Sequence, residues 1–245
     1  YLYFTILFIC WMVAAERAIC RVRTLDTLIQ QLINGVMLGS IYALIALGYT
    51  MVYGILRIIN FAHGDILMVG ALTTLSAINA LNTTFPHMPL LLQLGVALVI
   101  AMAVCAVLAM AVERFAYRRL RNAPRLAPLI SGIGVSVLLQ TVAMIIWTRN
   151  PLMFPQILPM DPIAVTSGSE THPPAIVTVT GIVTVALALA VMTGLWLLVE
   201  YTRLGRGMRA VAENPRVATL MGVNPNAIIT LTFAIGGVFA ALAGV

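Results

Sequence analysis

A short polar run, Asn60 to Asp65, lies between two apolar stretches of the sequence. It places an amide, an imidazole and a carboxylate beside a glycine (Asn60, His63, Gly64 and Asp65). A histidine–aspartate pair could transfer a proton or bind a charged solute. Enzymatic use is disfavoured, because neither a nucleophile nor a metal-binding set accompanies the pair.

Two interpretations of this run remain open. In the first, it is a broken helix beside a translocation path, where free backbone groups meet the charged ends of a substrate. In the second, it is a turn at the membrane surface, with His63 and Asp65 solvated and Asp65 capping the following helix. Tyr42 and Gln140 are further candidates for a substrate pathway, although each could instead bond to a neighbouring helix.

A second informative stretch covers residues 202–225. Its sequence predicts a short helix at Met208–Glu213 and another at Pro215–Met221, which starts with Asn214 as the N-cap and Pro215 at the first helical position. Gly222 is placed to end that helix, and Asn224 with Pro225 starts the next element in the same way.

The helix predicted at Pro215–Met221 is too apolar for a solvated loop. Its apolar residues are Val217, Ala218, Leu220 and Met221. Such a helix either docks into a groove of a partner protein or lies on lipid headgroups. Residue chemistry alone does not separate these two alternatives.

Composition indicates that these segments are positioned by helices in lipid. The 245 residues are 61% hydrophobic and 9% charged, with a mean hydropathy of +1.03, whereas soluble domains carry about 25% charged residues. All 14 basic residues are arginine. Without lysine the chain has no Walker A phosphate loop and no lysine Schiff base. The three cysteines form no CxxC pair and are interpreted as packing residues.

Six apolar segments are long enough to be candidate spans, for which about 20 residues suffice. They are Leu28–Leu56, Ile66–Leu81, Leu90–Val112, Leu126–Trp147, Ile176–Val199 and Ala227–Val245. The first exceeds the length of one span, which predicts a tilted helix followed by a broken or re-entrant piece. Residues 1–24 form a separate N-terminal segment, either signal-like or an extra span, before a membrane domain at 25–245. The sequence ends inside an apolar run, so we expect further spans beyond Val245.

The arginines predict the orientation of the spans. They cluster in Glu113–Arg125 and Glu200–Pro225, which are therefore expected in the cytoplasm, while the proline-rich Thr148–Ala175 holds one arginine and is expected outside. This topology explains the net charge of +6 without nucleic-acid binding. Small residues at four-residue spacing, such as Gly236, Ala240 and Gly244, favour closely packed helices. The predicted fold class is all-α, a polytopic transmembrane helical bundle.

Two long matches carry a family resemblance. The run from Gln31 to Gly54, continued by Asn60 to Asp65, closely resembles the permeases of high-affinity branched-chain amino acid ABC transporters. Shorter stretches are similar to the same family: Glu113-Arg114, Tyr117-Arg118, Leu129–Gly134, Gly205–Glu213 and Gly222–Asn224. The resemblance covers roughly Leu28 to Val245.

This resemblance implies a multi-pass permease of the bacterial inner membrane that imports leucine, isoleucine and valine. It implies a second permease subunit, two cytoplasmic ATP-binding subunits and a periplasmic or extracellular solute-binding protein. ATP is then used by the partner ATPase, and this chain binds no cofactor.

Importer permeases of this kind carry a coupling motif, Glu-Ala-Ala followed by three residues and Gly. Ala218 and Gly222 match it, whereas Arg216 stands at the glutamate position. The expected ATPase-coupling residues are Glu213, Arg216, Val217, Ala218, Met221 and Gly222, with Ala218 facing the ATPase groove.

Three competing functions stay open. The nearest is a permease of a urea or short-amide importer. The second is an intramembrane enzyme using His63 and Asp65, which the missing nucleophile disfavours. The third is a helical scaffold or channel without energy coupling, which the apolar Pro215–Met221 helix disfavours.

Overall fold

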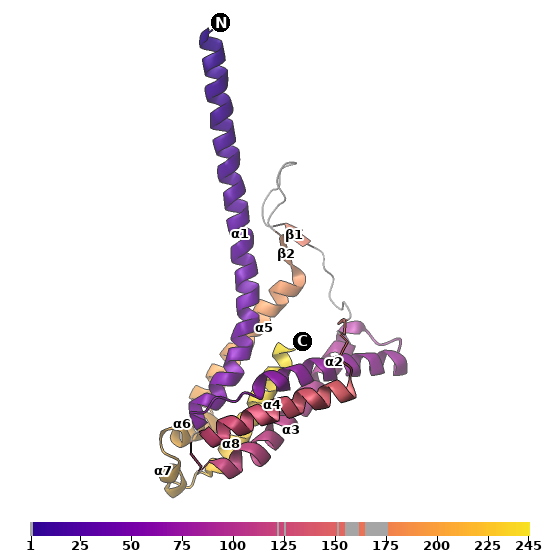
Figure 1. Cartoon of the computed structure of the whole chain (residues 1–245), viewed down its shortest axis with the longest axis vertical. Helices are drawn as coiled ribbons and strands as arrows, with labels where there is room; N and C mark the ends of the chain where they lie inside the picture. The colour runs from indigo at the N-terminus through magenta and orange to yellow at the C-terminus, as the bar shows by residue number, and fades with distance from the viewer. Residues whose placement is uncertain (1, 122, 125, 151, 155–161, 165–175) are drawn as a thin grey trace. The chain divides into compact units, whose positions relative to one another are not determined.

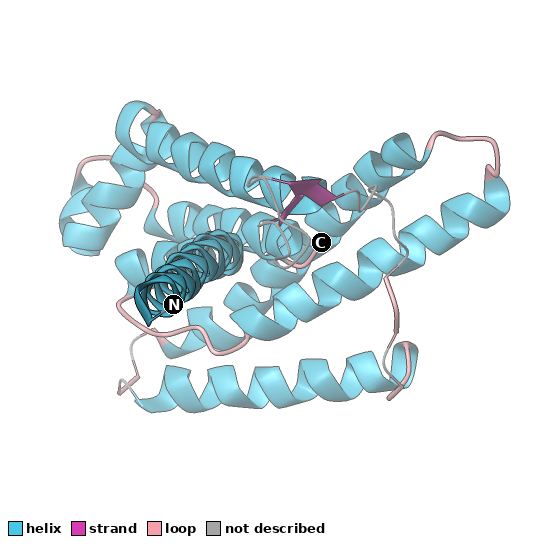
Figure 2. Cartoon of the chain, turned by 90° about the horizontal axis from the view of Figure 1, so that it is seen from above, coloured by secondary structure: helices cyan, strands magenta, loops and turns pink. Residues whose placement is uncertain are grey.

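The computed structural model describes residues 2–121, 123–124, 126–150, 152–154, 162–164 and 176–245. Helices make up most of the described chain (Figure 2), which confirms the predicted all-α class. The chain divides into two compact units. One comprises Tyr1–Ser40 and Leu158–Ala186, and the other comprises Ile41–Ile157 and Leu187–Val245.

The first unit contains the start of helix α1 (Leu2–Leu56) and the start of α5 (Val179–Tyr201). Strands β1 (Pro162–Ala164) and β2 (Ile176–Thr178) pair antiparallel within it. The Gln30 amide donates to the Ile176 carbonyl at 3.1 Å, and its carbonyl accepts from the Ile176 N–H at 2.7 Å. Most of the proline-rich segment predicted at Thr148–Ala175 lies outside the described residues.

The second unit holds the remaining helices together with the ends of α1 and α5. They are α2 (His63–Thr84), α3 (Leu90–Val112), the π-helix η1 (Glu113–Tyr117), the 3₁₀-helix η2 (Arg118–Leu120), α4 (Leu126–Ile146), α6 (Arg203–Glu213), α7 (Pro215–Leu220) and α8 (Pro225–Ala243). Among the described residues, six helical segments are long and apolar enough to cross a membrane. They correspond to the six predicted spans, so the chain is a multi-pass membrane protein.

Helices α2, α3 and α8 pack side by side and form the centre of the second unit (Figure 1). Glycines make this packing close. A Cβ atom at Gly237 of α8 would lie 2.5 Å from the Cys105 carbonyl oxygen of α3, and one at Gly70 of α2 would lie 2.9 Å from Cα of Ala241. Lipid tails give helices no hydrophobic reason to associate, so close backbone contact supplies much of the attraction. The three helices therefore form one tightly packed body.

Two predictions about the helix ends were wrong. Helix α1 continues without interruption to Leu56, so the break predicted within Leu28–Leu56 lies after that segment. A helix accepts each internal glycine at a cost of about 1 kcal/mol, and of the described glycines in α1 only Gly48 has a neighbouring residue within 4 Å of where a Cβ atom would lie. The arginine-rich segment Glu113–Arg125, expected to connect two spans, is helical through Leu120, since η1 and η2 extend α3.

The predicted turns of the 202–225 stretch are confirmed. The Asn214 side chain accepts from the N–H groups of Arg216 and Val217, at 3.0 and 3.3 Å. Asn224 caps α8 in the same way. Gly222 has φ +81°, the left-handed conformation expected after a helix end. Two helix bounds differ from the prediction: α6 begins at Arg203 rather than Met208, and α7 ends at Leu220 rather than Met221.

Substituting Gly237 should distinguish packing glycines from exposed ones. Gly237→Ala places a Cβ against the α3 backbone and should lower the thermal stability of the purified protein, by about 1–3 kcal/mol if overpacking follows its usual cost. Gly134→Ala in α4 meets nothing within 4 Å and should leave stability unchanged or slightly raised. Thermal unfolding in detergent measures both variants. Equal unfolding temperatures would contradict the close α3–α8 contact.

Candidate functional site

The linker between α1 and α2 is short and conformationally unusual. Arg57, directly after α1, has φ 54°, a left-handed conformation that costs a residue with a side chain about 1–2 kcal/mol. Its N–H still donates to the Tyr53 carbonyl at 2.8 Å, which closes the end of α1. Backbone strain of this kind is often retained at functional segments.

Asn60 organises the turn from this linker into α2. Its side-chain oxygen accepts from the Ala62 N–H at 3.2 Å and from the Tyr117 hydroxyl of η1 at 3.1 Å. Its backbone carbonyl accepts from the His63 N–H at 3.2 Å. Asn60 is buried, so these bonds satisfy an amide that would otherwise be costly. The polar run is thus anchored to the end of α3.

His63 is the first residue of α2 and is 1% exposed. Its ring lies edge-on to Tyr49, with the centroids 4.6 Å apart. A Cβ atom at Gly48 would lie 2.3 Å from Nε2 of His63, so the imidazole fills the notch left by that glycine on α1. Among the described residues Nε2 has no hydrogen-bond partner. The interpretation in which His63 is solvated was therefore wrong.

Asp65 is buried as well, and its predicted role as an N-cap was wrong. Ala62 occupies the N-cap position, because the Asn60 turn starts the helix earlier, and Asp65 lies in the first helical turn. A carboxylate there is favoured by the helix dipole. Asp65 Oδ1 accepts from the Gln140 amide of α4 at 2.9 Å, and that amide lies 3.4 Å from the Ser136 hydroxyl.

The structure therefore brings together two pairs of the predicted pathway residues. Asp65 and Gln140 are bonded directly, and Asn60 and His63 share the turn that starts α2. Tyr42 lies on α1 with 63% of its surface exposed, outside these bonds.

Helix α7 divides its apolar residues between two environments. Ala218 is 3% exposed and belongs to the core cluster that includes Val211 and Ile229. Its carbonyl accepts from the Val223 N–H at 3.0 Å, while the Gly222 N–H bonds to the Thr219 carbonyl at 3.1 Å. This pair of bonds is a Schellman motif. The prediction that Ala218 faces a partner was wrong, because its small side chain packs α7 onto its own chain.

The outward surface of α7 is apolar instead. Leu220 is 85% exposed, Met221 79% and Val217 52%. Arg216 and Glu213 are also exposed, at the start of α7 and the end of α6. The segment thus presents three apolar side chains on a unit fixed by Asn214 and Gly222.

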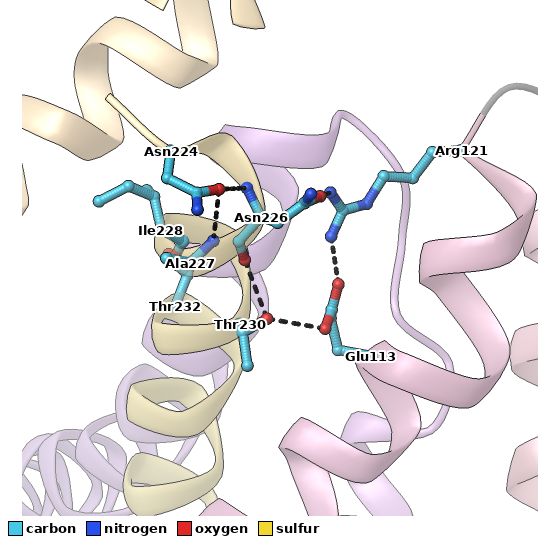
Figure 3. Close-up of polar contacts among 8 residues, drawn as sticks. All are labelled: Glu113, Arg121, Asn224, Asn226, Ala227, Ile228, Thr230 and Thr232. Atoms are coloured by element: carbon cyan, nitrogen blue, oxygen red, sulfur yellow. Dashed lines mark hydrogen bonds and ion pairs between the residues drawn. The ribbon is translucent and has the colours of Figure 1, made fainter. Parts of the chain in front are cut away.

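A third polar cluster, not predicted from the sequence, lies at the start of α8 (Figure 3). The Glu113 carboxylate is completely buried and pairs with Arg121. The Thr230 hydroxyl donates to its Oε2 at 2.9 Å, and Arg121 Nη1 donates to Asn226 Oδ1 at 2.6 Å. Glu113 could not be singled out, because it lies among arginines that predict a solvated loop.

These features define a class of protein: a polytopic helical membrane protein with buried polar clusters and a short helix that exposes apolar side chains between two spans. Residues 31–245 match the family model described as branched-chain amino acid transport system / permease component. The chain belongs to this family. The family consists of transporter permease subunits and not of enzymes.

Relatives from several bacteria agree with this assignment. The chain is 40% identical to the high-affinity branched-chain amino acid transport system permease protein BraD of Pseudomonas aeruginosa, over 89% of this chain and 69% of the relative. It is 40% identical to LivH of Escherichia coli (strain K12) and 39% identical to LivH of Salmonella typhimurium, with the same shares covered. No solved structure matches the chain significantly.

The notch contact between His63 and Gly48 leads to a compensation test. Gly48→Ala should lower thermal stability, because the buried imidazole cannot move aside without displacing Tyr49. His63→Ala should lower it too, by leaving a cavity. Combined, the two changes should cost less than their sum by at least about 0.5 kcal/mol, as contacting residues do.

The matched control is Gly54→Ala in the same helix, where a Cβ meets nothing within 4 Å. Unfolding temperatures in detergent of the unchanged protein, the two single variants and the double variant measure the coupling between Gly48 and His63. Strict additivity would show that His63 does not occupy the notch.

Proposed function

We propose that this chain is the membrane-spanning permease subunit of an ATP-driven importer of branched-chain amino acids in the bacterial inner membrane. The observation that carries the proposal is the family match over residues 31–245. It is supported by relatives whose names specify high-affinity branched-chain amino acid transport. The six spans supply the membrane domain that such a subunit requires.

Energy comes from another chain in this proposal. The sequence contains no lysine for a phosphate loop, so ATP is hydrolysed by two cytoplasmic partner subunits. A second permease subunit completes the membrane domain, and a periplasmic or extracellular binding protein delivers the solute. This chain itself binds no cofactor.

Helix α7 is the proposed seat of the ATPase. Val217, Leu220 and Met221 are exposed apolar side chains on a short helix between two capped turns, which suits a helix-in-groove contact. Ala218 supports this contact indirectly, because its buried side chain holds α7 against the core of the chain. Glu213 and Arg216 lie at the start of the same surface and are proposed as its charged rim. Gly222 ends α7 and sets the direction in which the chain leaves that helix.

The proposed substrate pathway runs beside the start of α2. Asp65 with Gln140 supplies polar groups where α2 meets α4, and the Asn60 turn and His63 hold this end of α2 in place. A carboxylate suits the ammonium group that every amino acid carries, whereas urea lacks such a charge. This favours the amino-acid importer over the amide variant. Tyr42 stays a candidate on exposed α1.

The docking proposal is tested by placing charge on the outward surface of α7. Leu220→Glu should abolish co-purification of the ATPase without lowering the permease's unfolding temperature, since the side chain is 85% exposed. Ala218→Glu should lower that temperature, because an unpaired buried charge costs at least several kcal/mol.

The matched control is Phe85→Glu, which adds the same charge at an exposed phenylalanine following α2 and should preserve ATPase recovery. If α7 instead lies on lipid headgroups, Leu220→Glu will reduce membrane insertion or expression and leave ATPase recovery intact. That result would refute the docking role.

Uptake by cells lacking their own importer tests the cargo. With the partner subunits and binding protein co-expressed, we expect accumulation of labelled leucine, isoleucine and valine. Gln140→Leu should reduce it, because the Asp65 carboxylate loses its amide donor. Transport of urea without leucine would replace the proposed cargo with an amide.

A further inference from the structure

The buried cluster around Glu113 belongs neither to the proposed pathway nor to the proposed docking surface. It joins three places in the chain: the π-helical end of α3, the segment after η2, and the first turns of α8. The Glu113 carboxylate pairs with Arg121 and accepts a hydrogen bond from the Thr230 hydroxyl, and Arg121 also donates to the Asn226 side chain (Figure 3).

The two α8 residues occupy a particular place. Asn226 and Thr230 are four residues apart, so they lie on one face of α8, in its first turns. Only Met221, Gly222, Val223 and Asn224 separate α8 from α7. The side chains of Val223 and Ile228 pack against the same core cluster as Ala218. A displacement of α7 therefore acts on the start of α8, directly through the four-residue connection and also through α6, which packs against both helices.

The start of α8 would be free to bend away from α3 if only apolar contacts held it there. Further along α8, Gly237 packs closely against Cys105 and Ala109 and holds α8 to α3. At the cytoplasmic end predicted from the arginines, the contact is polar and includes a completely buried carboxylate. Hydrogen bonds to charged groups are directional and about twice as strong as neutral ones.

We propose that Glu113 is a positioning residue for energy coupling: with Arg121, Thr230 and Asn226 it clamps the start of α8 to the end of α3. Movement of α7 is then passed to α3, and through Tyr117 of η1 to the Asn60 turn that starts α2. This inference rests on the proposed docking of an ATPase on α7. It adds the route by which that docking reaches the substrate pathway.

The π-helix supports this role. Residues Glu113–Tyr117 form one wide turn at the end of α3, and such turns occur frequently at functional sites. Both Glu113 and Tyr117 lie in it, one bonded to α8 and the other to the linker before α2. One helical turn thus bonds both to α8, the helix that follows the proposed docking helix, and to the linker before α2.

The test removes the α8 side of the clamp without leaving a buried charge unpaired. In Asn226→Ala combined with Thr230→Val, Glu113 keeps its ion pair with Arg121, while both side-chain bonds to α8 are lost. The assembled transporter, with ATPase, second permease and binding protein, is reconstituted in liposomes. Leucine uptake and ATP hydrolysis are measured on the same samples.

We expect normal ATPase recovery and continued hydrolysis, with leucine transported per ATP reduced by about tenfold, as the loss of bonds to a charged group predicts. As single changes, Thr230→Ser keeps the hydroxyl and should leave the ratio of leucine to ATP at its normal value, whereas Thr230→Val should reduce that ratio. Glu200→Gln is the matched control, because it breaks an ion pair with Arg209 in which both side chains are about half exposed.

An unchanged ratio of leucine to ATP, even with a lower unfolding temperature, would show that the cluster only stabilises the fold and would overturn the inference. Failure of the docking proposal gives a different result, since Leu220→Glu would then retain the ATPase. The single Thr230→Val variant provides the same comparison if the double variant does not insert.

Discussion

The contact between α3 and α8 restricts how the helices of the second unit can move. Gly237 lets the α8 backbone approach the Cys105 carbonyl so closely that no side chain fits between them. In lipid, where apolar helices gain nothing by leaving the hydrocarbon, such contact and the dispersion it permits replace the hydrophobic effect as the source of association. The same contact also removes freedom: α8 cannot slide along α3 without parting two backbones. Motion at its start must therefore be transmitted or resisted.

Buried polar residues restrict helix movement further, because each must keep its hydrogen-bond partners on neighbouring elements. Asn60 uses one oxygen for its own turn and for the Tyr117 hydroxyl, so the linker before α2 cannot rearrange without affecting the end of α3. Asp65 similarly ties α2 to Gln140 of α4. These bonds are expensive to break where water is scarce. They also join the elements proposed for transport more selectively than apolar packing would.

Much of this architecture could be predicted from the sequence, because spans and turns are local properties. The six spans follow from apolar length, and the units capped by Asn214 and Asn224 follow from the preference of asparagine and proline for helix starts. Burial could not be predicted in this way. Ala218 and Leu220 are both apolar and two residues apart, yet one is 3% exposed and the other 85%. Which of them faces outward depends on where α6 and α8 lie, and the sequence of α7 does not contain that information.

Glu113 shows the same limit for charge. A carboxylate followed by five nearby arginines reads as part of a solvated basic segment, and the arginines themselves are explained by membrane orientation. Only the three-dimensional arrangement reveals that one of them, Arg121, turns back to the carboxylate, and that Thr230 arrives from a helix more than a hundred positions later in the chain. A buried ion pair contributes little net stability compared with apolar residues of similar size. Its value lies in geometry, since it fixes which helix ends move together. In the proposed coupling, where a push on α7 reaches the Asn60 turn, this geometric constraint supplies the physical basis for passing the movement on.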